Sequence, residues 1–218
     1  MNIFIVGSAP KFEIPKDKID LVVTGNGAAE RAYQIEDLKK IKRYAITTHG
    51  EFIKNMQVRN KVLNSNSDKI ISRCGDISSY LNFKIDNSNY ELISQKKQLK
   101  IQSTVLENSF LDLFFSKLKY EENIINKLKH IKKLTYHFLG ASTGLFAAIY
   151  CLTKYPNANI FISGLSFYGG PRYYKVGKIT TKGDVLADDS MRLGRGRVDS
   201  YILSKIKAKF KNRIKIIT

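Results

Sequence analysis

Short apolar runs recur along the chain, and most of them are separated by longer stretches that place apolar residues at helical spacing. Short apolar runs bounded by glycine and polar residues are typical of buried β-strands. The predicted strands are 2–6, 20–24, 44–47, 69–72, 134–138, 159–164 and 213–217. Strands that alternate with helices in this way predict an α/β fold.

The stretches between the runs differ in how clearly they predict helices. Apolar residues at helical spacing predict the helices 30–42, 51–63, 107–133, 144–153 and 198–210. The stretch 76–100 is polar and poorly periodic, and it carries no predicted element.

The predicted helix 144–153 is almost entirely apolar, which indicates burial on most of its surface. Ser142 or Thr143 can cap its start with a side-chain hydroxyl, and 154–157, which contains Pro156, ends it. A strand and then a glycine- and tyrosine-rich loop follow, so helix, strand and loop form half of a parallel α/β unit. Ligands in such sheets bind beyond the carboxyl ends of the strands.

Several predicted strands end in a turn of small polar residues. The turns are Gly7-Ser8-Ala9-Pro10, Gly25-Asn26-Gly27 and Thr48-His49-Gly50. Small residues allow a phosphate or sugar to approach the backbone, and the free N–H groups at the start of helix 144–153 suit an anion. Ordinary strand-to-helix turns explain any one of them equally well, and the dinucleotide-binding fingerprint is not found.

Lysine and arginine number 37 against 19 acidic residues, which gives a formal net charge of +18. Such a charge favours anionic partners, either a membrane surface or anionic substrates; a Lys- and Asn-rich composition typical of an AT-rich genome is an equal alternative. Basic residues concentrate between 205 and 215, which indicates either contact with anionic membrane or a solvated surface. A nucleic-acid-binding function is least favoured, because no recognition helix, zinc spacing or aromatic RNA-binding motif is found.

The cysteines, the apolar runs and the length of the chain indicate its compartment and its domain organisation. Cys74 and Cys151 provide no disulfide framework, and Cys151 is predicted to be a small core residue. The first apolar run is too short for a signal peptide, and no run can span a bilayer. We therefore expect a cytoplasmic protein with possible peripheral contact on the inner face of the membrane. The length predicts one domain, 1–218, with a lid or substrate loop at 175–197.

A set of motifs resembles a known family. They are the small turn after the first strand, Asn26 after the second, Ser142-Thr143-Gly144, and Gly164-Leu165-Ser166-Phe167-Tyr168 followed by Tyr174. Together they resemble the bacterial sialyltransferases of the Campylobacter type, whose core is shared by the motility-associated-factor flagellin glycosyltransferases. The resemblance covers residues 1–50 and 140–218.

The resemblance implies a single Rossmann-like domain with a mainly parallel sheet, helices on both faces and a small lid. It implies inverting transfer of a nonulosonic, sialic-acid-like or Kdo-like sugar from a CMP-activated donor to a glycan or lipid-linked acceptor. No metal or other cofactor is implied, since the CMP-sugar is a co-substrate. Tyr168 and Tyr174 would donate hydrogen bonds to the departing phosphate, where charge develops. The implied donor-binding residues are Gly7, Ser8, Pro10, Asn26, Ser142, Thr143, Gly144 and Ser166.

The chain departs from the family pattern at two positions. The family's histidine base corresponds to Arg195, which stays protonated and cannot accept a proton, and a family arginine corresponds to Gly140. Arg195 would then contact the phosphate or the sugar carboxylate.

A different base is therefore needed. His49, at a predicted strand end, is favoured over His130 and His137, and Asp188 and Asp189 are the carboxylate candidates. The alternative function is a nucleotide-sugar binder that does not catalyse transfer or acts differently.

Overall fold

The structure is a computed structural model of residues 1–218. It describes residues 1–9, 12–81, 89–107, 141–165 and 199–217, and also 111, 112, 115, 124, 125 and 128.

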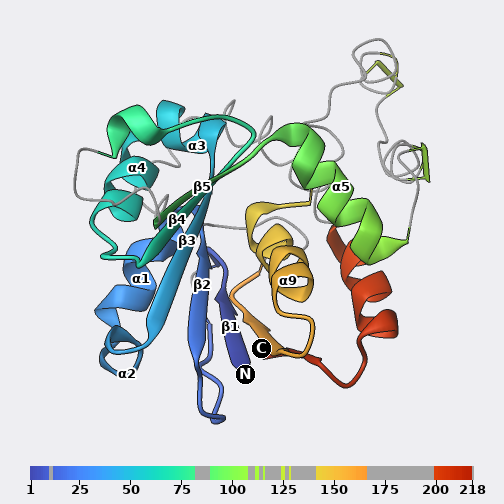
Figure 1. The fold of residues 1–218 in the computed structure, drawn as a ribbon, viewed down its shortest axis with the longest axis horizontal. Helices are drawn as coiled ribbons and strands as arrows, with labels where there is room; N and C mark the ends of the chain where they lie inside the picture. The colour runs from blue at the N-terminus through green and yellow to red at the C-terminus, as the bar shows by residue number, and fades with distance from the viewer. Residues whose placement is uncertain are drawn as a thin grey trace.

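The described strands form one seven-stranded sheet in which every pair of neighbours is parallel (Figure 1). The strands are β1 Asn2–Val6, β2 Leu21–Gly25, β3 Lys42–Thr48, β4 Lys69–Arg73, β5 Tyr90–Ile93, β6 Asn159–Ser163 and β7 Ile214–Ile216. Apart from β5, each lies on a predicted run, and the predicted strand 134–138 lies outside the described residues. The predicted α/β class with a Rossmann-like parallel sheet is confirmed.

The strand order is β5-β4-β3-β2-β1-β6-β7. From β1 the chain adds strands on one side as far as β5, and then returns to place β6 and β7 on the other side of β1. The direction of winding therefore reverses between β1 and β6. In open parallel sheets, this reversal marks the place where the carboxyl ends of the strands accommodate ligands.

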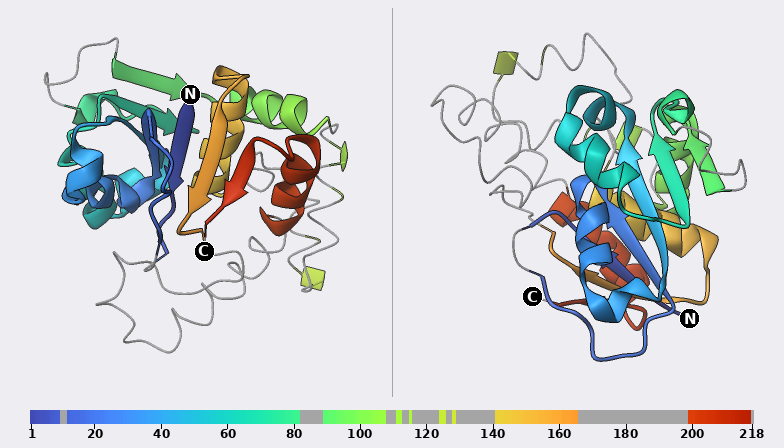
Figure 2. Two further views of the ribbon diagram at one scale, coloured as in Figure 1. Left: turned by 90° about the horizontal axis from the view of Figure 1, so that it is seen from below. Right: turned by 90° about the vertical axis from the view of Figure 1, so that its left-hand side faces the viewer.

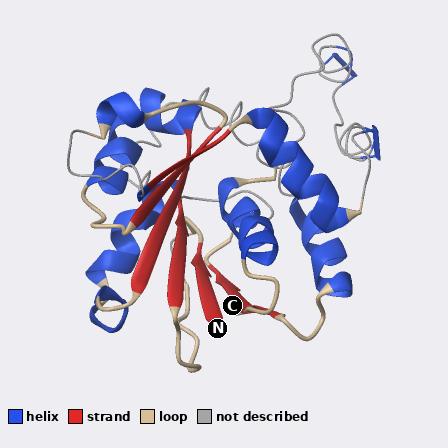
Figure 3. Ribbon diagram, in the orientation of Figure 1, coloured by secondary structure: helices blue, strands red, loops and turns tan. Residues whose placement is uncertain are grey.

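Helices cover both faces of the sheet (Figures 2 and 3). One face carries α5 Gln95–Leu106, α9 Thr143–Lys154 and a helix over 199–209. The other face carries α1 Ala29–Gln34, α2 Glu36–Lys39, α3 His49–Lys54 and α4 Met56–Leu63. None of the described helices is long and apolar enough to cross a bilayer.

The alternation of side chains along the strands builds a core on each face. In β1, Ile3 and Ile5 pack beneath α9, whereas Phe4 and Val6 pack beneath α1 and α2. Every residue of α9 from Thr143 to Leu152 is buried, which confirms the predicted buried helix and its end at Lys154. The free thiol of Cys151 is fully buried there, as predicted.

Two predicted helices are broken in the structure. The stretch 30–42 forms α1 and α2 with an extended residue, Ile35, between them, and Lys42 already belongs to β3. The stretch 51–63 forms α3 and α4, separated by the extended residue Asn55. The Asn55 side chain accepts hydrogen bonds from the N–H groups of Gln57 and Val58, which makes it the N-cap of α4.

The unassigned stretch 76–100 contains a short 3₁₀ helix, η2 Ser78–Tyr80, all of β5 and the first half of α5. Only Ile93 of β5 is buried, because β5 is an edge strand. The predicted helix start at 107 is wrong: Glu107 has a left-handed backbone (φ 53°) and is the C-cap of α5. Most of 108–133 lies outside the described residues.

Candidate functional site

The carboxyl edge of the sheet gathers most of the predicted binding residues that are described. Gly7 and Ser8 follow β1, Asn26 follows β2, and His49 follows β3. The start of α9 lies against the same edge, because a Cβ added to Gly25, the last residue of β2, would lie 3.2 Å from the Gly144 nitrogen. The turns that follow β1, β2 and β3 therefore lie at one edge of the sheet.

Asn26 joins three elements through its side chain. Its Nδ2 donates to Thr143 Oγ1 (3.1 Å), and its Oδ1 accepts from Thr47 Oγ1 (3.3 Å) and from the N–H of Thr48 (3.2 Å). Asn26 is 8% exposed and has a left-handed backbone (φ 49°), a conformation that asparagine tolerates better than most residues. It thus fixes α9 relative to β2 and β3, and holds Thr143 in place.

Gly7, which follows β1, and Gly144, at the start of α9, are in close contact with the residues that follow β6. A Cβ added to Gly7 would overlap the carbonyl oxygen of Gly164 and Cδ2 of Leu165, and one added to Gly144 would overlap the same Cδ2. The N–H of Gly7 donates to the Ser163 carbonyl (2.9 Å). The space that Gly7 and Gly144 leave by having no side chain is therefore occupied by the residues that follow β6. The Leu165 side chain lies over both glycines.

The start of α9 is held by a carboxylate from a distant part of the chain. Ser142 is the N-cap of this helix, as predicted, but its hydroxyl makes no capping hydrogen bond. Instead, the N–H of Ser142 donates to Oδ1 of Asp199 (3.0 Å), the first described residue after 165. Asp199 is 5% exposed and places negative charge at the positive end of the α9 dipole.

Arg73, at the end of β4, positions the segment before α9. Its Nε donates to Gln98 Oε1 (3.0 Å), its Nη2 donates to the Ala141 carbonyl (2.9 Å), and its guanidinium lies 4.3 Å from the centre of the Phe146 ring. Gln102 Oε1 accepts from the Ala141 N–H (3.0 Å). None of these residues was predicted from the sequence; the available signal is an arginine that ends an apolar strand, followed by two glutamines one helical turn apart.

Arg31 of α1 holds the turn that follows β1. Its Nη1 donates to the Ala9 carbonyl (2.5 Å), and its guanidinium lies 4.3 Å from the centre of the Phe12 ring. The N–H of Ala9 donates to the Gly164 carbonyl (2.8 Å). This second arginine, also not predicted, places positive charge beside Ser8 at the carboxyl edge.

His49 begins α3 at the same edge and is partly exposed. Its ring packs against Gly75, where an added Cβ would lie 2.5 Å from Cγ of the imidazole. Beyond Gly75, a shallow hollow of about 360 Å³ opens beside β4 and β5, away from the carboxyl ends of β1 and β6. It is lined by Cys74, Gly75, Leu92, Ser94, Gln95 and Lys96. Burial raises the pKa of the Cys74 thiol, so the thiol lining this hollow stays protonated.

The other predicted site residues lie outside the described residues. They are Pro10, Ser166, Tyr168, Tyr174, Asp188, Asp189 and Arg195, together with His130, His137 and the predicted lid 175–197. The two described residues that flank 166–198 do lie at the site: Leu165 packs on Gly144, and Asp199 binds Ser142.

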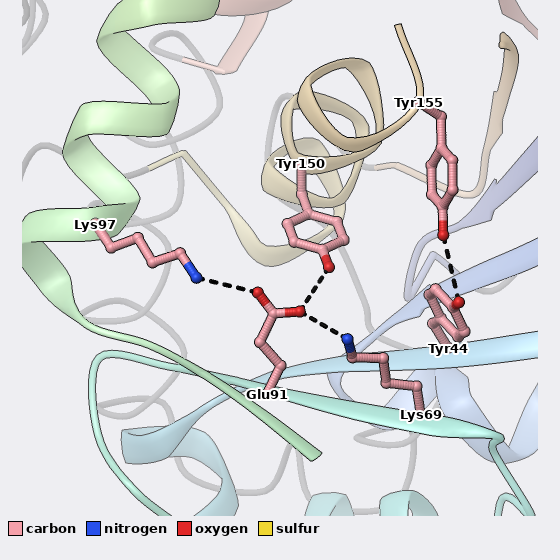
Figure 4. A network of polar contacts seen from close by, with 6 residues as sticks. All are labelled: Tyr44, Lys69, Glu91, Lys97, Tyr150 and Tyr155. Atoms are coloured by element: carbon pink, nitrogen blue, oxygen red, sulfur yellow. Dashed lines mark hydrogen bonds and ion pairs between the residues drawn. The ribbon is translucent and has the colours of Figure 1, made fainter. Parts of the chain in front are cut away.

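A second polar cluster lies on the α5 and α9 side of β4 and β5 (Figure 4). Glu91 Oε2 lies 2.8 Å from Lys69 Nζ and accepts a 2.8 Å hydrogen bond from Tyr150, while its Oε1 lies 3.2 Å from Lys97 Nζ. Burial alone would raise the pKa of Glu91, but the hydrogen bonds from Lys69 and Tyr150 and the charge of Lys69 outweigh it and lower the pKa to about 2. Burial and the hydrogen bond to Glu91 raise the pKa of Tyr150. These groups satisfy one another, so the cluster fastens α5 and α9 to the edge of the sheet.

Within the described part of the chain, no group of three or more His, Cys, Asp or Glu residues is arranged to hold a metal ion. No protein-family model, curated protein or solved structure matches the chain.

Proposed function

We propose that the carboxyl edge of the sheet, at the start of α9, binds a CMP-activated acidic sugar, and that the chain transfers this sugar to a surface glycan or a lipid-linked acceptor. The observation that carries the proposal is the position of the two residues that flank 166–198. Leu165 packs on Gly7 and Gly144, and Asp199 binds the backbone of Ser142. The segment with Tyr168, Tyr174, Asp189 and Arg195 therefore leaves and rejoins the fold beside the predicted donor-binding residues.

The charges and donors at this edge suit an anionic donor. Arg31 lies beside the turn after β1, Arg73 lies below the start of α9, and Asn26 fixes the Thr143 hydroxyl. The formal net charge of +18 attracts such a substrate over longer distances.

In the proposed reaction, an acceptor hydroxyl attacks the anomeric carbon from the face opposite the phosphate. The new C–O bond forms as the bond to the phosphate oxygen breaks, and CMP leaves with the electron pair. Hydrogen bonds from Tyr168 and Tyr174 stabilise the charge that develops on the leaving oxygen, and Arg195 adds a positive charge. The acceptor proton passes to a base, for which His49 is the described candidate.

Ligand-dependent melting of the full chain tests the donor site. CMP or CDP at about ten times its Kd raises the free energy of unfolding by about 1.4 kcal/mol, which is about 3–5 °C in Tm for a chain of this size; UDP and GDP serve as comparison ligands. No shift with millimolar CMP or CDP in a folded protein would contradict the proposal.

Release of CMP from CMP-activated nonulosonic acids tests the chemistry. Each of Tyr168→Phe and Tyr174→Phe is expected to lower the rate of release by about 10²–10³ with little change in Tm. Tyr80→Phe, at an exposed tyrosine of η2, is the matched control and leaves the rate unchanged. Equal rates in all three variants would argue against a role for the paired phenols.

A second candidate is favoured by Arg195 and by the Leu165 side chain that lies over Gly7 and Gly144. In this case the chain binds the nucleotide sugar without transferring it. CMP would then raise Tm while no donor releases CMP, and CMP release gained in Arg195→His would indicate descent from an active enzyme.

A further inference from the structure

Large apolar side chains are exposed together between residues 111 and 128. Of the side chains described in this stretch, five are apolar and between 59% and 71% exposed: Leu111, Phe115, Ile124, Ile125 and Leu128. They lie beyond α5, away from the sheet (Figure 1). Soluble monomers rarely expose so many large apolar side chains within a short stretch unless the surface contacts a partner or a membrane.

Within 111–128 three lysines are matched by three carboxylates, and the excess of lysine comes from the residues that follow this stretch. Lysines outnumber carboxylates between 107 and 133, and they are Lys117, Lys119, Lys127, Lys129, Lys132 and Lys133. A segment that combines Leu, Ile and Phe with lysines has the composition of an amphipathic element that lies in a membrane interface.

The fold brings a second basic segment to the start of this stretch. Lys209, in the helix over 199–209, places its Nζ 2.5 Å from Glu107 Oε1, and the same Nζ donates to the Val105 carbonyl (3.3 Å). Glu107 immediately precedes 108–128. Lys205 and Lys207 are exposed side chains of this helix, and Lys211 is exposed in the turn that follows it. The helix is fastened at the point where the apolar stretch begins.

Part of the basic C-terminal run has a structural role instead. Arg213 donates from Nε to the Ala158 carbonyl (3.0 Å) and from Nη2 to the Tyr155 carbonyl (3.4 Å). These bonds hold the turn before β7 against the turn after α9. Arg213 therefore stabilises the packing of these two turns.

We propose that the exposed apolar residues of 111–128, together with Lys205, Lys207 and Lys211, form a surface that docks on an anionic lipid bilayer. The apolar side chains enter the boundary between head groups and acyl chains, and the lysines attract the anionic head groups. Charge complementarity selects this occupant: the surface is basic, and the whole chain carries a formal net charge of +18. This proposal does not depend on the donor site. A chain docked in this way would keep that site near lipid-linked molecules.

Co-sedimentation of the full chain with lipid vesicles tests the proposal. Vesicles of equal parts phosphatidylcholine and phosphatidylglycerol are expected to bind the protein, and vesicles of phosphatidylcholine alone are not. Binding is expected to weaken as salt is added, since salt screens exposed charges. Equal binding to both vesicle types would overturn the proposal.

Two triple variants separate the contribution of Lys205, Lys207 and Lys211 to vesicle binding from that of the net charge. The triple variant Lys205→Gln, Lys207→Gln, Lys211→Gln is expected to lose about fivefold in vesicle affinity for each lysine, about a hundredfold in all. The matched control removes three exposed lysines elsewhere, Lys16→Gln, Lys40→Gln and Lys54→Gln, and is expected to lose less than about tenfold through net charge alone. A control that loses as much as the first triple would overturn the proposal.

The apolar contribution is tested with Ile124→Ser, Ile125→Ser, Leu128→Ser. This variant is expected to keep the Tm of the parent and to bind the mixed vesicles more weakly, because its side chains no longer enter the boundary between head groups and acyl chains. Unchanged binding would overturn the proposal. So would a dimer in solution that these substitutions convert to a monomer, since the apolar residues would then be covered by a second copy of the chain.

Discussion

The backbone N–H of Ser142 donates a 3.0 Å hydrogen bond to Oδ1 of Asp199, across a separation of 57 residues in sequence. The bond joins the start of α9 to the helix over 199–209, whereas the Ser142 hydroxyl makes no capping bond. Together with the Leu165 side chain on Gly144, it brings both flanks of 166–198 to one helix terminus.

Asp199→Ala is expected to lower the free energy of unfolding by about 1–3 kcal/mol, because a partly buried N–H at the start of α9 loses a charged acceptor. Asp199→Asn, which keeps an acceptor oxygen, is expected to cost less. The control is Asp17→Ala, at an exposed carboxylate 3.9 Å from Lys215, with a change of about 0.5 kcal/mol or less. Urea unfolding at pH 7 measures all three, and equal costs for Asp199→Ala and Asp17→Ala would contradict the role given to Asp199.

Asn26→Gly separates the side-chain bonds of Asn26 from its backbone conformation. Glycine adopts a positive φ freely, so the expected loss of about 2 kcal/mol in the free energy of unfolding comes from the hydrogen bonds to Thr143, Thr47 and Thr48. Asn66→Gly is the matched control, since Asn66 is exposed and also has a positive φ (46°), and its change is expected within about 0.5 kcal/mol. If the two variants unfold at the same denaturant concentration, the Asn26 amide does not hold the three elements together.

Gly144→Ala is expected to destabilise the fold by about 1–3 kcal/mol, because the new Cβ overlaps the Leu165 side chain. Adding Leu165→Ala removes the overlapping atoms, so the double variant is expected to be more stable than the sum of the two single changes predicts. Gly50→Ala, at a helical glycine with no atom within 4 Å of an added Cβ, is expected to stabilise by about 0.5–1 kcal/mol. Strict additivity at Gly144 and Leu165, measured by thermal or urea unfolding, would place the Leu165 side chain elsewhere.

Glu91→Gln is expected to produce a pH-dependent loss of stability. The pKa of Glu91 is lowered to about 2 in the folded chain, against about 4.3 when unfolded. The unfolded state therefore binds the proton more readily, and the carboxylate contributes stability above the unfolded pKa that disappears as the pH falls towards 2. The difference from the parent is expected to be about 3 kcal/mol at pH 6–7 and to shrink through acidic pH.

The control for Glu91 is Glu36→Gln. Glu36 pairs with Lys39 one helical turn away, and its side chain is 79% exposed. Such pairs contribute about 0.5 kcal/mol or less. A difference at Glu91 that stays constant from pH 7 to pH 3 would show that packing, and not the charge shared with Lys69 and Lys97, accounts for the loss.

The local pattern of the chain was sufficient for every described strand except β5 and for the buried helix. A strand such as β1 must present Ile3 and Ile5 to one face and Phe4 and Val6 to the other, so an apolar run buried on both sides is visible in the sequence. The small residues at the strand ends also predicted one common edge, because parallel strands end at the same edge of a sheet. The sequence therefore determined the fold class, most strands, the buried α9 and the edge at which the candidate site lies.

The tertiary structure alone decided which side chains act at that edge. Asp199, Arg73 and Gln102 contact the segment before α9 from elements far away in sequence, and no local periodicity marks such contacts. The same reason explains why β5, an edge strand with one buried residue, was not predicted. It also explains why the sequence did not show that Leu165 covers Gly7 and Gly144. Hydrophobic spacing depends on neighbours a few residues apart, whereas these partners and the room for a ligand depend on how distant elements pack.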